Sequence, residues 1–190
     1  MVKRCEWAEY NKEMKEYHDN EWGTPEHDDR KLFENIVLQG SQAGLSWNTI
    51  LQKRVNYRKV FKNFDYEKVV EYDEEKIEEL LQNDGIVRNR LKIESAISNA
   101  KTFLKIRKEF GTFNKYIWQF VDFKPIHNSW ESLEQIPGKT ELSVKISKDM
   151  KKRGFKFVGP TIVYALMQSI GMVNDHLSYC FRYQELKNKY

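Results

Sequence analysis

The chain has 190 residues, of which 40% are hydrophobic, and it carries a formal net charge of +4 at pH 7. This composition excludes a disordered chain, and no apolar run approaches the ~20 residues that a membrane span needs. The N-terminal stretch lacks the apolar core of a secretory signal, so we expect a cytoplasmic protein with no membrane partner. The basic balance permits an anionic partner such as a nucleic acid.

Helix signals follow one another along the first half of the chain. Asp28 or Asp29 can cap a helix over residues 31–44, in which apolar residues recur at helical spacing. An aspartate also stands in cap position at the start of the next two predicted helices, 65–72 and 73–82.

The same signals continue in the second half of the chain. The longest predicted helix covers residues 90–111 and ends at Gly111, and another helix begins after Thr112. The apolar face that we assign to the longest helix consists of Leu91, Ile97, Ala100 and Leu104. Residues 122–142, which include two prolines and Gly138, predict a long irregular connection.

Two further helices are predicted within residues 143–171, joined by the stretch FKFVGP. Gly159 followed by Pro160 suits the start of the second helix, whose free backbone N–H groups form an anion site. Basic side chains surround this turn: Lys151, Lys152, Arg153 and Lys156. The segment resembles the helix-hairpin-helix element that binds a DNA phosphate, and an ordinary helical hairpin with a solvated basic face is the alternative.

No stretch shows the alternating pattern of a strand, and no internal repeat is visible. The sequence therefore predicts an all-α fold, and we assign residues 1–190 to a single domain with its hairpin at about residues 143–171.

The first quarter of the chain is rich in aromatic residues: Trp7, Tyr17, Trp22 and Trp47. A core needs leucine and isoleucine more than several tryptophans, because each indole N–H must find a partner. Such a cluster, interleaved with polar side chains, favours a pocket that stacks a flat heterocycle. Each tryptophan singly also fits an ordinary core position.

The stretch NDHLSYC contains His176 and Cys180, which would share one face if the segment is helical. The other cysteine, Cys5, lies at the opposite end of the chain. These residues alone leave open a disulfide, a metal site or two buried thiols. A reducing cytoplasm argues against the disulfide.

Several motifs in register make the chain recognisable: RCEW, YHDNEWG, QAGLSW, KKRGFKFVG and VNDH. In this order and spacing they resemble the bacterial 3-methyladenine DNA glycosylase I family of the helix-hairpin-helix glycosylase superfamily. The resemblance implies an enzyme that removes N3-methyladenine from alkylated duplex DNA, releases the free base and has no lyase activity. It also implies one structural zinc ion that ties the two chain ends together.

The resemblance identifies four zinc ligands: Cys5, His18, His176 and Cys180. Two thiolates with two neutral imidazoles make a closed tetrahedral set that neutralises the dication. A zinc hydrolase would instead need an open metal position and a nearby base, which four protein ligands do not leave.

The resemblance also implies roles in base recognition. Trp47 is expected to stack on the flipped base, Tyr17 to hydrogen-bond or flank it, and Trp7 and Trp22 to complete an aromatic wall. These residues, with Gln39, form the predicted base-binding site, and we take Gln39 and Tyr17 as its catalytic residues.

For the DNA, the resemblance implies that Gly44 and Leu45 fill the gap left in the duplex, as apolar wedges do, with core packing as the alternative for Leu45. Gly159 and Thr161 would offer backbone donors to a phosphate, with Arg153 and Lys156 beside them.

Two positions depart from related patterns. Gln39 stands where members of the family usually have a glutamate, so the pocket loses a charge that would attract a cationic base. Asn174 stands where many glycosylases of the superfamily carry a catalytic aspartate, and we expect the adjacent Asp175 to pair with a zinc-ligand histidine or to cap a helix. Gln39 favours one alternative, a non-catalytic reader of damaged DNA on the same scaffold. Nothing in the sequence suggests an obligate oligomer.

Overall fold

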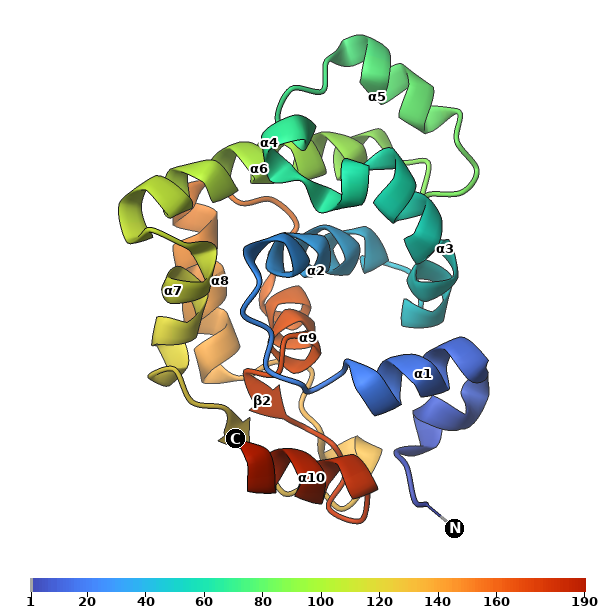
Figure 1. The fold of residues 1–190 in the computed structure, drawn as a ribbon, viewed down its shortest axis with the longest axis vertical. Coiled ribbons are helices and arrows are strands. Elements are labelled where there is room, and N and C mark those ends of the chain that lie inside the picture. Colours follow the sequence, from blue (N-terminus) through green and yellow to red (C-terminus); the bar gives the residue numbers. More distant parts are fainter. Residues whose placement is uncertain (1) are drawn as a thin grey trace.

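The computed structural model describes residues 2–190, which fold mainly into α-helices (Figure 1). The helices are α1 Lys12–Asn20, α2 Asp29–Gln42, α3 Trp47–Val60, α4 Tyr66–Val69, α5 Glu74–Leu81, α6 Arg90–Phe110, α7 Phe113–Trp118, α8 Glu141–Arg153, α9 Pro160–Ser169 and α10 Phe181–Lys189. Short 3-10 turns lie at Glu6–Tyr10, Lys62–Phe64, Gln119–Val121 and Leu133–Gln135. The predicted all-α class is confirmed, and no helix among residues 2–190 is both long and apolar enough to cross a membrane.

Most predicted helix starts are confirmed by their capping hydrogen bonds. The side chain of Asp28 accepts a hydrogen bond from the backbone N–H of Lys31, and that of Thr112 accepts one from Lys115. Asp65 differs, because it makes no capping hydrogen bond to any described residue, and the helix after it is only the four residues of α4.

The buried face of α6 differs from the predicted one. Leu91 is 66% exposed, although Ala100 is buried as expected. The side chains that face the core are Ile93, Ala96, Ala100, Phe103 and Ile106. These residues follow the i+3 and i+4 spacing of one helical stripe, from which Leu91 is displaced by two residues, about 200° around the helix.

The connection predicted over residues 122–142 is more ordered than the sequence indicated. It contains the two-residue strand β1 (Ile126–His127), which pairs in parallel with β2 (Val173–Asn174), so that Ile126 lies opposite Val173. The backbone N–H of Ser178 also donates to the carbonyl oxygen of Trp130 at 2.8 Å. This connection is therefore held against the segment between α9 and α10.

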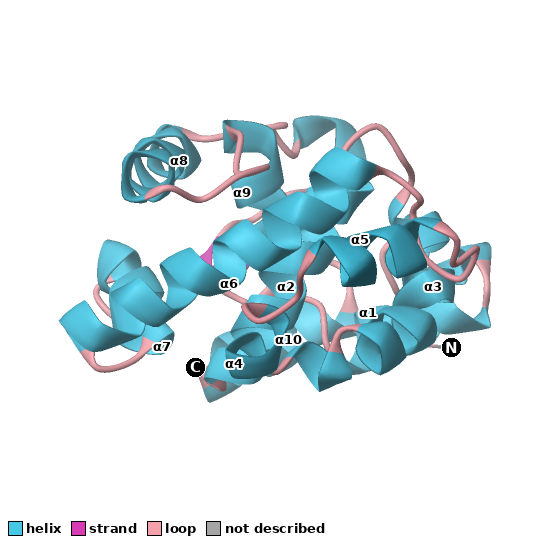
Figure 2. Cartoon of the chain, turned by 90° about the horizontal axis from the view of Figure 1, so that it is seen from above, coloured by secondary structure: helices cyan, strands magenta, loops and turns pink. Residues whose placement is uncertain are grey.

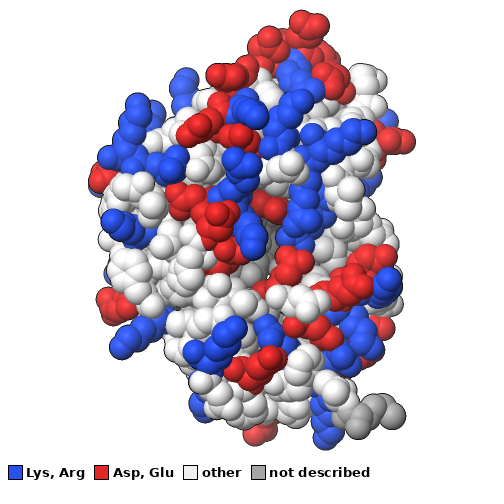
Figure 3. All heavy atoms as spheres, viewed as in Figure 1, with Lys and Arg blue, Asp and Glu red and all other residues white. Residues whose placement is uncertain are grey.

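Helix α2 lies at the centre of the molecule and packs against α3, α6, α7 and α9. Figure 2 shows α8 and α9 side by side along one side of the molecule, with α6 next to them. A second, smaller apolar cluster surrounds the two chain ends and contains Cys5, Tyr17, Trp22, Leu177, Cys180 and Tyr183. On the face drawn in Figure 3, basic and acidic side chains are interspersed and acidic ones gather over α5, so the net positive charge does not make this face uniformly basic.

Candidate active site and metal centre

The structure brings together the four predicted metal ligands. Cys5 precedes the first 3-10 turn, His18 lies in α1, and His176 and Cys180 lie in the turn between β2 and α10 rather than on a helix. All four are buried, and their ligand atoms lie within 4.8 Å of one another. Nε2 of His18 is 3.2 Å from Nδ1 of His176 and 3.4 Å from Sγ of Cys180. A buried Cys₂His₂ set of this kind suits a tetrahedral metal ion.

Two residues of the cluster, Cys180 and His176, have protonation states that favour metal binding. The hydrogen bond from Cys5 and those from the two imidazoles lower the pKa of the Cys180 thiol, although burial opposes the shift. Burial lowers the pKa of His176, which keeps this imidazole neutral. A thiolate and a neutral imidazole are the forms in which these side chains bind a metal.

An outer carboxylate orients one ligand of the cluster. Oδ1 of Asp19 accepts a hydrogen bond from Nδ1 of His18 at 2.8 Å, which leaves Nε2 of this ring facing the other ligands. Arg4 holds Asp19 in place, with its Nη2 2.8 Å from Oδ2.

Asp175 was expected to pair with a histidine ligand or to cap a helix, and that prediction was wrong. Its carboxylate is buried and points toward α9 and the 122–142 connection. It accepts hydrogen bonds from Asn128, Trp130, Tyr164 and Gln168. It therefore fastens this connection to α9.

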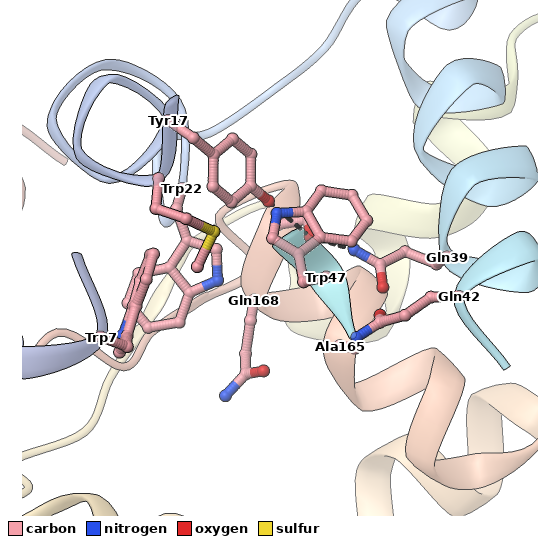
Figure 4. A pocket seen from close by; sticks show the side chains of 10 residues that line it. Trp7, Tyr17, Trp22, Gln39, Gln42, Trp47, Ala165 and Gln168 are labelled. Carbon is pink, nitrogen blue, oxygen red and sulfur yellow. Dashed lines mark hydrogen bonds between the residues drawn. The ribbon is translucent and has the colours of Figure 1, made fainter. Parts of the chain in front are cut away.

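An aromatic cavity of about 230 Å³, drawn in Figure 4, has walls that contact the metal ligands. Its lining residues are Trp7, Met14, Tyr17, Trp22, Gln39, Gln42, Trp47, Ala165, Gln168 and Ser169. Every residue of the predicted base-binding site is among them. Trp7, Tyr17 and Trp22 come from the N-terminal segment, whereas Gln39 and Trp47 come from α2 and α3 on the other side (Figure 4).

The rings of the cavity pack on one another and on the metal ligands. The ring of Trp7 meets that of Trp22 edge-on at 5.0 Å between centroids, and Tyr17 lies 5.2 Å from Trp47. Trp7 also packs edge-on against His18 at 5.1 Å, and Trp22 against His176 at 4.6 Å. The two histidine ligands thus support the back of the aromatic wall.

The polar groups of the cavity converge on Ser169. Its Oγ accepts hydrogen bonds from Nε2 of Gln39 at 2.6 Å and from the hydroxyl of Tyr17 at 3.0 Å. Burial raises the pKa of Tyr17, so its hydroxyl stays protonated and remains a donor. Oε1 of Gln39 and Nε1 of Trp47 are buried with no hydrogen-bond partner among residues 2–190. An acceptor and a donor left unpaired in an aromatic cavity suit a planar heterocycle that carries both kinds of group.

The predicted wedge residues lie beside this cavity. Gly44 has a φ of +77° and Leu45 is 41% exposed, so Leu45 is not a core residue. A second cavity of about 370 Å³ adjoins the first. It lies between this loop and the start of α9, where Thr161 is located. It is lined by Gln39, Gln42, Ala43, Gly44, Leu45, Thr161, Ile162 and Ala165.

The hairpin turn between α8 and α9 follows the predicted pattern. Helix α8 ends at Gly154, with a φ of +107°, and Gly159 and Pro160 begin α9. Gly159 offers no side chain to cap the helix, so the first N–H groups of α9 are available to an anion. Lys156 is exposed on this turn.

Arg153 is not directed to the start of α9. Its Nε donates to Asp149 at 2.8 Å and its Nη1 to Glu109 at 2.8 Å. Its Cζ also lies 5.0 Å from the ring centroid of Phe110 and 5.1 Å from that of Tyr116. The guanidinium thus joins α8 to α6 and α7.

Sequence reasoning missed the contribution of α9 to the cavity. Ala165 and Ser169 lie four residues apart on this helix, and Gln168 is adjacent to Ser169. Small residues spaced by four on the second helix of the hairpin leave space along one face, which was the available signal.

Comparisons with known proteins agree with this geometry. The methyladenine glycosylase family model matches residues 7–183. The chain is 47% identical to a DNA-3-methyladenine glycosylase of Haemophilus influenzae, over 95% of this chain and 97% of that one. It is also 47% identical to DNA-3-methyladenine glycosylase 1 of Escherichia coli, over 96% and 97%.

Solved structures give the same result. A crystal structure of a 3-methyladenine DNA glycosylase I superposes with a TM-score of 0.92 at 50% identity, covering 94% of this chain and 98% of that one. A tyrosine-to-phenylalanine variant of such an enzyme in complex with 3-methyladenine gives 0.91 at 33% identity, with 94% and 96% covered. The chain belongs to the methyladenine glycosylase family.

Proposed function

We propose that this chain is a DNA-3-methyladenine glycosylase I, which hydrolyses the N-glycosidic bond of N3-methyladenine in alkylated duplex DNA and has no lyase activity. The observation that carries the proposal is the aromatic cavity with the unpaired acceptor of Gln39 in its wall. Membership of the family and the relative bound to 3-methyladenine support the same reaction.

In this proposal the cavity receives the base after it has left the duplex. The indole of Trp47 stacks on the base, and Tyr17, Trp7 and Trp22 form the rest of the wall. Oε1 of Gln39, which is buried and unpaired, accepts a hydrogen bond from the exocyclic amino group of the adenine ring.

The leaving group supplies much of the driving force for the reaction. N3-methyladenine carries a formal positive charge while it is attached to the sugar, so the bond breaks as the base departs neutral. Water then adds to the sugar cation and releases one proton to solvent. No carboxylate lines the cavity among residues 2–190. Asn174, which stands at the place of the superfamily aspartate, is buried and donates to the carbonyl oxygen of Tyr183. We assign Gln39 and Tyr17 to catalysis. They act by binding the neutral base as it leaves, which stabilises the transition state for bond breaking.

Duplex DNA is bound along the side that carries the hairpin. We assign Gly44 and Leu45 to the gap that the flipped nucleotide leaves, because this loop is exposed beside the cavity. The backbone N–H groups at Gly159 and Thr161, with the side chain of Lys156, bind a phosphate. We leave Arg153 out of this group, since its guanidinium is already paired with Asp149 and Glu109.

The metal centre is proposed to hold one structural zinc ion. Its donors would be Cys5, His18, His176 and Cys180, a set that fills a tetrahedral shell and leaves no open position for a hydrolytic water. The ion would join the two chain ends and fix the rings of Trp7 and Trp22, which pack on the histidine ligands. We propose that residues 1–190 act as a single domain and as a monomer.

One other function is favoured by a specific observation. The neutral Gln39 could make the chain a reader that binds damaged DNA without turnover. Release of free N3-methyladenine from methylated duplex DNA, measured for the unchanged chain and for Gln39→Glu, separates the two. Release by the unchanged chain supports the glycosylase, whereas release only by the variant would leave this chain as a binder.

A further inference from the structure

Helix α6 contacts the loop that carries the wedge residues. Lys92, in the first turn of this helix, donates through Nζ to the carbonyl oxygens of Ser41 at 2.9 Å and Ala43 at 2.7 Å. These carbonyls close the C-terminal end of α2, directly before Gly44 and Leu45. An ammonium group is stabilised at this position because the carbonyl end of a helix carries partial negative charge.

The same helix contacts the hairpin turn through a second side chain. Asn99 is 2% exposed, and its Oδ1 accepts from the backbone N–H of Lys156 at 2.8 Å while its Nδ2 donates to the carbonyl oxygen of the same residue at 3.1 Å. Lys92 and Asn99 are seven residues apart, which is about two helical turns, so both lie on the same side of α6. In Figure 1 the α8–α9 turn reaches up to α6, which crosses above α2.

We propose that Lys92 and Asn99 are positioning residues, and that α6 fixes the spacing between the wedge loop, residues 43–46, and the hairpin turn, residues 154–159. The inference rests on the proposed function, in which both segments touch one duplex. A wedge and a phosphate contact must meet that duplex at a set distance, and the longest helix of the protein connects the two anchor points through side-chain hydrogen bonds.

Four variants on α6 test this. Lys92→Met keeps the length of the side chain and removes its donors, and Lys92→Arg keeps them. Lys101→Met is the matched control, because Lys101 is exposed on the same helix. The first readout needs no catalysis. It is the fluorescence of 2-aminopurine placed opposite an abasic-site analogue in a duplex. This fluorescence rises when an inserted wedge residue unstacks the 2-aminopurine from its neighbours.

We expect Lys92→Met to lower this fluorescence rise and to lower kcat/KM on methylated duplex by about tenfold to a hundredfold, the scale that small misplacements cause. Its affinity for free 3-methyladenine should stay unchanged, because that needs only the aromatic cavity. Lys92→Arg should restore both duplex readouts, and Lys101→Met should change neither. Asn99→Leu should weaken duplex affinity and reduce its salt dependence, because a displaced hairpin loses phosphate contacts.

Two results would overturn the positioning role. One is a fluorescence rise in Lys92→Met equal to that of the unchanged chain. The other is a parallel loss of free-base affinity and melting temperature, which would show an effect on the whole fold. If the unchanged chain released no base, the proposed function would fail, but the fluorescence comparison would still decide the role of Lys92.

Discussion

Gln39 and Ser169 are joined by a 2.6 Å hydrogen bond that fixes the side-chain amide of Gln39 in the wall of the aromatic cavity. Because Nε2 donates to Oγ of Ser169, the carbonyl Oε1 is the atom left without a partner among the described residues. In the proposed complex the base thus meets a neutral acceptor and no carboxylate. Recognition of the exocyclic amino group is kept, and attraction of the positive charge is lost.

The first prediction concerns that charge. Gln39→Glu should raise kcat/KM for N3-methyladenine release, because a charged hydrogen-bond partner strengthens binding of the cationic nucleotide by about 1.5–3 kcal/mol, or roughly tenfold to a hundredfold. The hydroxyl of Ser169 can turn to donate to the new carboxylate, so the variant should fold as before. Single-turnover excision from methylated duplex measures the rate. Gln42→Glu, which adds the same charge to the same cavity, is the control, and an equal gain there would contradict a specific role for position 39.

The second prediction concerns Ser169. Ser169→Ala removes the acceptor shared by Gln39 and Tyr17 and leaves both groups unpaired in a buried site, which costs about 1–3 kcal/mol. We expect weaker binding of free 3-methyladenine, measured by quenching of tryptophan fluorescence. Tyr17→Phe should cost less, because the serine then keeps Gln39. The two changes together should cost less than their sum, since they share one hydrogen bond, and strict additivity would argue against the shared network.

The third prediction concerns alkaline pH. Burial raises the pKa of Tyr17 above its ordinary value of about 10. A raised pKa means that the folded state holds its proton more tightly than the unfolded state, so the contribution is present below pH ~10 and is lost as pH rises further. The free energy of unfolding in urea should therefore stay nearly level up to about pH 9 and fall between about pH 9.5 and pH 11. Tyr17→Phe should show a smaller fall, and an identical fall would assign the effect to the other buried tyrosines.

The fourth prediction concerns the outer shell of the metal centre. Asp19→Asn removes the carboxylate that accepts from His18 and should weaken metal affinity by about tenfold to a hundredfold. Competition with a chromophoric chelator measures this affinity. Asp84→Asn, at an exposed position, is the control. Metal analysis of the purified chain should find one zinc ion per molecule, and removal of the ion should lower the melting temperature.

Local sequence patterns predicted the helices well because their signals lie within a few residues. Asp28 and Thr112 cap their helices through contacts three residues away. The buried face of α6 was harder to predict, because it depends on which neighbouring elements cover the helix. Leu91 fits an apolar pattern but is exposed.

The candidate site was found through the resemblance to a family, because its parts are dispersed. Cys5 and Cys180 have no spacing that would indicate a shared metal. Arg153 seemed free to bind phosphate, yet its partner Glu109 is 44 positions away and belongs to another helix. Ser169 carries no chemical signature in the sequence, and only the packing of α9 against α1 and α2 brings its hydroxyl to Tyr17 and Gln39.

A metal ion held by this cluster would also determine how the molecule bears mechanical load. Cys5 and Cys180 lie close to the two chain ends and belong to one buried cluster, so tension applied at the ends would pass from one cysteine to the other through the bound ion. The segment between them, which contains the cavity and the hairpin, would carry none of that force until the cluster broke. A processive unfoldase pulling from the N-terminal end would meet this cluster early, whereas one pulling from the C-terminal end would first have to unfold α10.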